Sequence, residues 1–183
     1  KNLLQSHHGF SGMEYGLFDT NEDCLLAVGW QDICTLFHRV HPVSCARCRE
    51  SDAYVKQHLQ GIAGEFLEYR CKNGMVHVAL PIMVAGRHLA TFFTGQFFYD
   101  NDLPDRAFFI NQAGELGFDQ ATYLAALDRV PLFSREHVRT NVLFLQNVVE
   151  MLAEVGLANL KLKQEAEERR KAEETLLRRE AEL

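Results

Sequence analysis

The sequence has no long apolar run, and basic residues do not cluster outside its C-terminal tail. No stretch of the 183 residues approaches the roughly 20 apolar residues that a transmembrane helix needs, so we expect no membrane partner. Phosphate binding needs a concentrated positive face, whereas the formal net charge here is −6. We therefore expect this domain to bind no nucleic acid.

Cysteine is sparse and shows no framework spacing. The chain has five cysteines, an odd number that fits free thiols in a reducing compartment better than a set of disulfides. We therefore expect a cytoplasmic location. The chain begins at "KNLLQS" without a methionine and stops inside a helical pattern, so we expect it to be a piece of a longer protein.

Short apolar segments separated by turn residues predict five β-strands. Two of them flank the turn "TNED" inside residues 14–31. The others are 65–71, 75–84 and 87–99. Asn73-Gly74 separates the first two of these, and Asn-Gly is the strongest short hairpin signal, so we expect an antiparallel meander.

Helical patterns fill most of the remaining sequence. They cover residues 32–39, 42–60, 104–118 and 119–130, and a long helix begins after Ser134. Asp32 is the expected N-cap of the first helix. Pro42 separates it from the second, because proline is tolerated in a first turn and not inside a helix. Gly117 is the expected break between the third and the fourth.

The long helix carries an apolar repeat of period 3.5, which is the coiled-coil condition. Eight of eleven positions at alternating steps of three and four are apolar: Val148, Met151, Val155, Ala158, Leu162, Glu165, Arg169, Ala172, Leu176, Arg179 and Leu183. A single solvated helix is the alternative, favoured by the charged stretch "KQEAEERRKAEE". We expect a homodimer through this seam, with the helix continuing toward a downstream module in the same chain.

The stretch "DICTLFHRVHPVSCARCRES", residues 32–51, concentrates cysteine and histidine and allows three hypotheses. The first is a zinc or iron site. Helical spacing can bring Cys34, His38 and His41 to one turn, and thiolate and imidazole are the preferred ligands of these metals. The second is nucleophilic catalysis by Cys34 with His38 or by Cys71 with His77, although no oxyanion-hole motif accompanies either pair.

The third hypothesis is a largely apolar ligand pocket with a few convergent polar groups. Gln96 favours it, because a buried amide inside an apolar strand needs a partner and offers both a donor and an acceptor. Its expected ligand-binding residues are Trp30, Cys34, Phe37, His38, His41, Cys48, Cys71, Asn73, Phe93, Gln96 and Phe98. Core packing is the alternative role for the phenylalanines.

Several strings, in this order, resemble the PocR ligand-binding family, a variant of the PAS-like sensory fold. They are "GLFDTNEDCLLAVGWQDICTLFHRVHP", "CRESD", "YRCKNGMVHVALPI", "GRHLATFFTGQFFY" and "NQAGELGFDQATYLAALDRVP". The resemblance implies a non-catalytic cytoplasmic sensor of bacterial or archaeal regulators and histidine kinases, which recognises short alcohols, diols or related hydrocarbon derivatives. It also implies a shared set of Cys34, His38, His41, Cys48 and Cys71, the metal ligands of the alternative hypothesis.

The combined prediction is an α+β domain: a PAS-like five-stranded antiparallel sheet with inserted helices, followed by a long C-terminal coiled-coil helix. Residues 1–13 are expected to form an N-terminal linker or helix, 14–145 the sensory domain and 146–183 the signalling helix. The tail "LKQEAEERRKAEETLLRREAEL" looks like the helix that joins such domains to a following PAS or histidine-kinase module.

Overall fold

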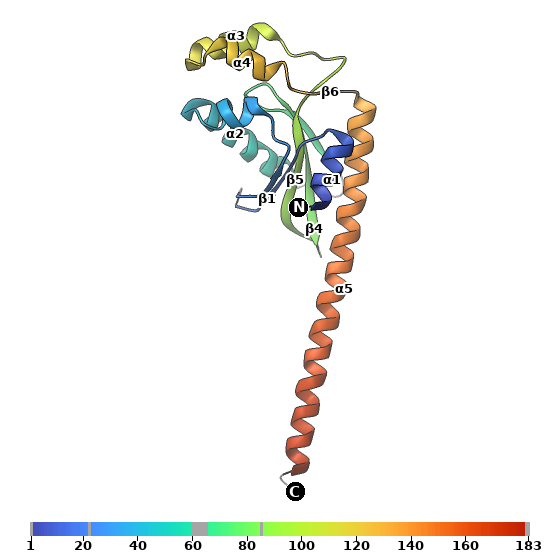
Figure 1. The fold of residues 1–183 in the computed structure, drawn as a ribbon. Coiled ribbons are helices and arrows are strands. Elements are labelled where there is room, and N and C mark those ends of the chain that lie inside the picture. Colours follow the sequence, from blue (N-terminus) through green and yellow to red (C-terminus); the bar gives the residue numbers. More distant parts are fainter. Residues whose placement is uncertain (1, 22, 60–65, 85, 182–183) are drawn as a thin grey trace.

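The fold is built on an antiparallel sheet with helices on both of its faces (Figure 1). The computed structural model describes residues 2–21, 23–59, 66–84 and 86–181. The strands β1 (Tyr15–Asp19), β2 (Cys24–Val28), β3 (Leu67–Arg70), β4 (Val76–Val84) and β5 (Arg87–Tyr99) lie in the order β2-β1-β5-β4-β3. The predicted antiparallel sheet is confirmed. A two-residue strand that was not predicted, β6 (Leu132–Phe133), pairs in parallel with β5, and it is too short to show an alternating pattern.

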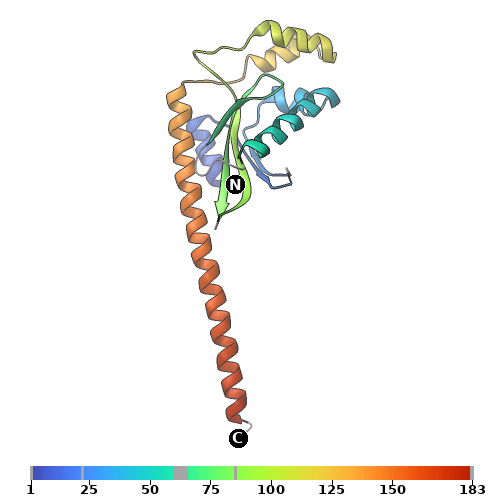
Figure 2. The same ribbon diagram turned by 180° about the vertical axis from the view of Figure 1, so that it is seen from behind.

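The inserted helices that the sequence predicts are present. The full set of described helices is α1 (Asn2–Ser11), the π-helix η1 (Ile33–His38), α2 (Pro42–Leu59), α3 (Arg106–Leu116), α4 (Gln120–Leu127) and α5 (Arg135–Ala181). Helix α2 lies on one face of the sheet, α1 and the start of α5 lie on the other, and α3 and α4 form a separate layer at one end (Figures 1 and 2). Asp32 occupies the predicted N-cap position of η1, but its side chain makes no capping hydrogen bond there and accepts one from Arg129 at 2.7 Å instead.

The main core lies between the sheet and α5. Val78 and Leu80 of β4 alternate toward this side and pack with Val142 and Leu145 of α5. Two smaller clusters complete the interior. One joins α2 to the opposite face of the sheet, and the other lies beneath α3 and α4 and includes Phe98 of β5.

A β-bulge at Gln96 changes which side chains of β5 face which layer. His77 of β4 pairs with Gly95 while Val76 pairs with Phe97, so Gln96 is the extra residue, and its φ of 72° lies in the left-handed region. Side chains alternate along a strand, so one inserted residue reverses the faces beyond it. As a result, Phe97 packs in the α5 core.

Helix α5 continues far beyond the domain, 47 residues in all (Figure 2). Val138 and Val142 at its start are buried, whereas the seam residues Met151, Val155 and Leu162 are between 52% and 62% exposed. By length and composition alone, α5 is a helix that could cross a membrane. Of its most apolar window of residues, 11% is buried in the domain. Its predicted coiled-coil partner remains a prediction.

The end of α3 offers a matched pair of glycines. Gly117 caps the helix with φ 69°, whereas Gly114 lies inside the helix, and an added Cβ would have no atom within 4 Å at either position. We expect Gly117→Ala to lower the free energy of unfolding by about 1 kcal/mol, because L-residues disfavour this conformation. Gly114→Ala should raise it by about 0.5–1 kcal/mol. Denaturant unfolding measures both, and equal effects would contradict the assigned helix end.

Candidate functional site

A small cavity of about 30 Å³ lies between the sheet and the segment formed by η1 and α2. Aromatic rings make up much of its wall. Phe18 of β1 lies beside Trp30 and Phe93, with ring centroids 6.1 and 5.0 Å away. Tyr69 of β3 also lines the cavity. The rings leave a restricted space into which several polar side chains project.

Glu14 is the least expected of these polar residues, because its side chain is only 1% exposed. One carboxyl oxygen, Oε1, accepts a hydrogen bond from Gln31 Nε2 at 2.5 Å. The other, Oε2, has no hydrogen-bond partner within the described part of the chain. Burial raises the pKa of Glu14 from 4.5 to about 8, against the opposing effect of its hydrogen bonds. Glu14 can therefore carry a proton near neutral pH and present a polar oxygen to a ligand.

Gln96 joins the sheet to the segment above the cavity. The bulge leaves it 4% exposed, and its Oε1 accepts a hydrogen bond from the Gln31 backbone N–H at 2.6 Å. Because Gln31 also contacts Glu14, a single residue immediately before η1 is held by two residues of the cavity wall. The amide oxygen of this buried glutamine is thus bonded to the backbone of the chain, and its predicted role in ligand binding stays a prediction.

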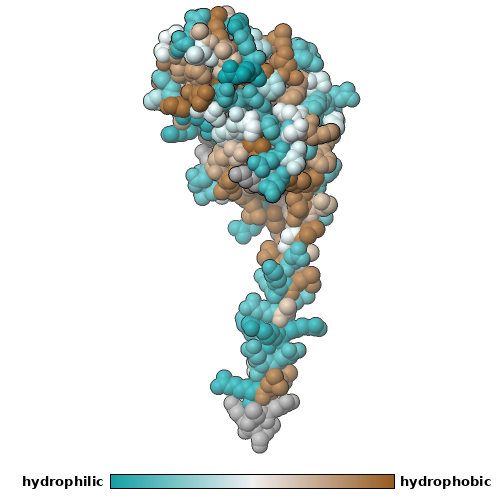
Figure 3. Space-filling view, in the orientation of Figure 1, coloured by the Kyte–Doolittle hydropathy of each residue, from teal (hydrophilic) through white to brown (hydrophobic). Residues whose placement is uncertain are grey.

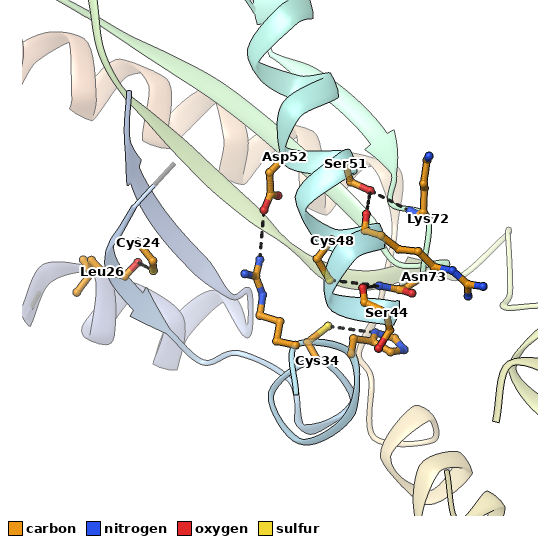
Figure 4. A network of polar contacts seen from close by, with 12 residues as sticks. Cys24, Leu26, Cys34, Ser44, Cys48, Ser51, Asp52, Lys72 and Asn73 are labelled. Carbon is orange, nitrogen blue, oxygen red and sulfur yellow. Dashed lines mark hydrogen bonds and ion pairs between the residues drawn. The ribbon is translucent and has the colours of Figure 1, made fainter. Parts of the chain in front are cut away.

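Arg39 and Asp52 supply the opposite charges of the cavity wall. The Arg39 guanidinium lies 3.8 Å from Asp52 Oδ2 of α2 and 4.7 Å from the centre of the Trp30 ring. Figure 4 shows Asp52 with this ion pair, on the same helix as Cys48. Trp30 is itself fixed, since its indole N–H donates to the Tyr15 carbonyl at 3.0 Å. The arginine therefore connects the end of η1 to α2 across the cavity.

His77 and Gly95 form the base of the site on β4 and β5. A Cβ at position 95 would lie 2.5 Å from the His77 ring, so this close approach requires glycine. The ring stacks on Tyr69 with 5.3 Å between centroids. Burial, and then the charge of Arg39, lower the pKa of His77 to about 3. This histidine is therefore neutral at physiological pH.

The structure divides the predicted site residues between the cavity and the packing around it. Trp30, Phe93 and Gln96 line the cavity. Phe98, Phe37, Cys34 and Cys71 belong to the hydrophobic cluster beneath α3 and α4. Phe98 lies in this cluster because of the bulge, which turns its ring toward Phe109 of α3, with ring centroids 5.9 Å apart.

The predicted residues of the loop and of α2 occupy separate positions. Asn73 Nδ2 donates to the Ser44 carbonyl at 2.9 Å and lies 3.2 Å from Cys48 Sγ, so the Asn-Gly turn is tied to α2 (Figure 4). His41 lies before α2, where its Nδ1 accepts a hydrogen bond from the Val43 N–H at 3.3 Å.

His38 connects η1 to the layer of α3 and α4. Its Nε2 lies 2.7 Å from the Tyr123 hydroxyl, to which Gln112 Nε2 donates at 2.6 Å, and Arg47 of α2 donates to the Gln112 amide oxygen at 3.1 Å. Burial lowers the pKa of His38 to about 4. This neutral histidine, with its partners, links four helices, so its described contacts are those of a packing residue.

The three inner thiols are not activated groups. Burial is the main cause that raises the pKa of Cys34, of Cys48 to about 11, and of Cys71. Cys34 Sγ lies 3.9 Å from His38 Nδ1, but that histidine is a weak base and the thiol a weak acid. Protonated thiols are poor nucleophiles.

The cysteines and histidines do not converge into a metal centre. Among the described residues, which include Cys34, His38, His41, Cys48 and Cys71, no group of three or more His, Cys, Asp or Glu side chains could hold a metal ion. The helical spacing of Cys34, His38 and His41 therefore does not bring three ligands together among the described residues. The donor set does not fit zinc or iron.

Sequence reasoning missed Glu14, Arg39, Asp52 and Tyr69 as cavity residues and considered His77 only as a base for Cys71. A weak signal existed for Glu14, since it is an acidic residue directly before an apolar strand. The others could not be found from sequence, because β3, β4 and α2 come together only in the folded sheet.

A sheet in the order 2-1-5-4-3, with helices inserted above a small cavity, defines the class of PAS-like sensory domains. The family model described as the sensory domain found in PocR matches residues 1–157. The chain belongs to the PocR sensory-domain family, as its motifs indicated. No curated protein and no solved structure matches the chain.

The orphan carboxyl of Glu14 predicts a pH-dependent stability. Its pKa is higher in the folded chain than the ordinary 4.5, so the stability it contributes is complete below that pH and is lost as the pH rises to about 8. The loss is at most about 1.4 kcal/mol per pH unit. We expect Glu14→Gln, which keeps an acceptor for Gln31, to gain stability over the parent across this range.

Urea unfolding of both proteins at several pH values measures this difference. Glu136→Gln, at an exposed position in the first turn of α5, is the matched control and should leave the pH profile unchanged. Parallel profiles for the parent and Glu14→Gln would contradict the raised pKa.

Proposed function

We propose that this domain senses a small, uncharged organic molecule, such as a short alcohol or diol, in the cavity beneath η1 and α2. The family supports a sensory role in a signalling protein. The single observation that carries the proposal is Glu14 Oε2, a buried carboxyl oxygen at the cavity that has no partner in the described chain. A buried polar atom of this kind is favourable only if something hydrogen-bonds to it.

The dimensions and charges of the cavity support a small neutral ligand. A volume of about 30 Å³ gives room for about two waters or a few heavy atoms of comparable size. The described wall carries two carboxyl groups, Glu14 and Asp52, and one guanidinium, Arg39, which already contacts Asp52. A carboxylate ligand would lie close to both acids, whereas a hydroxyl can accept a hydrogen bond from the protonated carboxyl of Glu14 without burying a net charge.

The proposed signal passes from the cavity to α5 through the end of β5. Gln96 lines the cavity, and two residues later the Phe98 N–H donates to the Pro131 carbonyl at 3.1 Å. The Asp100 N–H then donates to the Phe133 carbonyl at 3.0 Å. These bonds fix β6 to β5, and α5 begins directly after β6. A ligand that binds two arrangements of Gln96 unequally can therefore shift the position of α5.

The output we propose is a dimeric coiled coil of α5 that acts on a downstream PAS or histidine-kinase module in the cytoplasm. The apolar seam supports this, because Met151, Val155, Leu162 and Leu176 are all more than half exposed in the single chain. Figure 3 shows such apolar side chains separated by hydrophilic ones along the free part of the helix. A second copy would bury the seam while the charged side chains stay in water.

Removing the polar atoms of Glu14 should weaken ligand binding. With propylene glycol as the probe, we expect Glu14→Leu to bind at least about tenfold more weakly, the loss of roughly one buried hydrogen bond. Glu14→Gln presents an amide N–H in place of the O–H of the protonated carboxyl and should bind like the parent at neutral pH. Isothermal titration calorimetry measures the dissociation constants.

Propionate is the charged comparison ligand and should bind more weakly than propylene glycol. Circular dichroism checks that each variant is folded. Undiminished binding of propylene glycol by a folded Glu14→Leu would overturn the assignment of the cavity. If no short alcohol, diol or aldehyde binds to the parent or to its variants, the ligand class is wrong.

A charge placed in the seam should weaken the dimer. Leu162 and Leu160 are 62% and 59% exposed, but only Leu162 occupies a seam position. We expect Leu162→Asp to raise the dimer dissociation constant at least about tenfold, because the seam would bury an unpaired charge. Leu160→Asp is the matched control and should leave it unchanged, as measured by sedimentation equilibrium.

Two results would refute the coiled coil. One is a monomeric parent, and the other is an equal effect of both substitutions. Flotation of the parent with phosphatidylcholine vesicles would instead indicate that the exposed apolar residues of α5 enter a lipid surface.

A further inference from the structure

A second cavity, larger than the first, lies on the opposite face of the sheet, under the start of the output helix. Its volume is about 100 Å³. Strands β4 and β5 contribute Leu80, Ile82, Met83 and Phe92, and α5 contributes Leu145 and Val149. Leu80, Phe92 and Leu145 are at most 5% exposed, whereas Met83 is 42% exposed. The cavity therefore reaches from the main core to the edge of the domain.

The chemistry of this cavity differs from that of the first. Its described wall is mainly hydrocarbon, and Glu150 is the one ionisable group among the described lining residues. Gln146 Nε2 donates to Glu150 Oε1 at 3.2 Å, so the two polar side chains contact each other. An anion would be repelled by Glu150, and any charge would lose its hydration against the apolar wall. The wall thus fits an uncharged apolar molecule.

The dimer seam leaves this cavity accessible. Val149 lines the cavity and Met151 belongs to the seam, and residues two positions apart point to nearly opposite sides of a helix. A second copy on the seam therefore does not cover the cavity. An occupant of the cavity would contact β4 and α5 together, at the place where α5 leaves the domain.

We propose that this cavity is a second ligand site, which takes a small uncharged hydrocarbon or aromatic molecule and stabilises the docking of α5 on the sheet. An apolar cavity of about 150 Å³ binds benzene in a well-studied protein. At about 100 Å³ the present cavity is smaller, so the expected occupant is no larger than benzene. Filling the cavity restores dispersion contacts on both walls. Binding to the docked state alone raises the stability of that state by mass action.

The four methionines provide the test, because only Met83 lines the cavity. In protein labelled with carbon-13 at the methionine methyl groups, benzene should shift the Met83 signal upfield and saturably, through its ring current. The signals of the buried Met13 and Met75 and of the seam residue Met151 should not move. The midpoint of thermal unfolding should rise by about 2–4 °C.

Two variants test the location. Val149→Phe fills the cavity and should abolish the Met83 shift, whereas Val40→Phe makes the same change at a position that is 69% exposed and lies outside the seam, and should retain it. Ile82→Phe fills the cavity from the strand side and serves if Val149→Phe does not fold. Benzoate should leave the Met83 signal unshifted, because it carries a charge.

Three results would overturn the proposal: a shift that does not saturate, a common shift of all four methionines, or a Met83 shift that survives in a folded cavity-filling variant. Glu14→Leu should leave the benzene response intact. The second site and the proposed function of the first cavity can therefore fail separately.

Discussion

The bulge at Gln96 is the constraint on which both faces of the sheet depend. One extra residue with a positive φ reverses the alternation of β5, so that Phe97 packs toward α5 while Phe98 turns to the layer of α3 and α4. The same bulge places the Gln96 amide against the Gln31 backbone. Without the reversal, the end of β5 would present its large rings to the wrong layers. One local irregularity thus fixes the side chains that enter the core, the side chains that line the cavity, and the hydrogen bond between Gln96 and Gln31.

Charge and burial are distributed unevenly around this bulge. The cavity beneath η1 holds a carboxyl with a raised pKa, a neutral histidine and a guanidinium shared between a ring and a carboxylate. The thiols that dominate the sequence motif lie in or beside hydrophobic packing instead. The two groups differ in what they lose when they leave water. A buried thiol behaves as a small apolar side chain, whereas a buried carboxyl needs a hydrogen-bond partner.

The arrangement connects the cavity beneath η1 and α2 to α5 by short steps. From Gln96 to β6 the path consists of backbone hydrogen bonds, which are stiff, and α5 begins immediately after them. The docking of α5 depends instead on side-chain packing over the sheet, where the second cavity lies. Rigid attachment at the start of the helix and looser packing about three to four turns later are what a helix needs in order to move as a unit about its first residues.

The sequence by itself determined the elements. Alternation, Asn73-Gly74, Pro42, Gly117 and the 3.5-residue repeat are local patterns, and local backbone preferences decide strands, turns and helix ends. The tertiary structure alone decided which side chains meet. Glu14, Tyr69, Asp52 and His77 come from separate elements, and the bulge that orients Gln96 depends on pairing with β4. Cysteines and histidines that are close in sequence predicted a shared site. In the structure most of these side chains lie in hydrophobic packing, because contacts depend on position in space and not on spacing in the sequence.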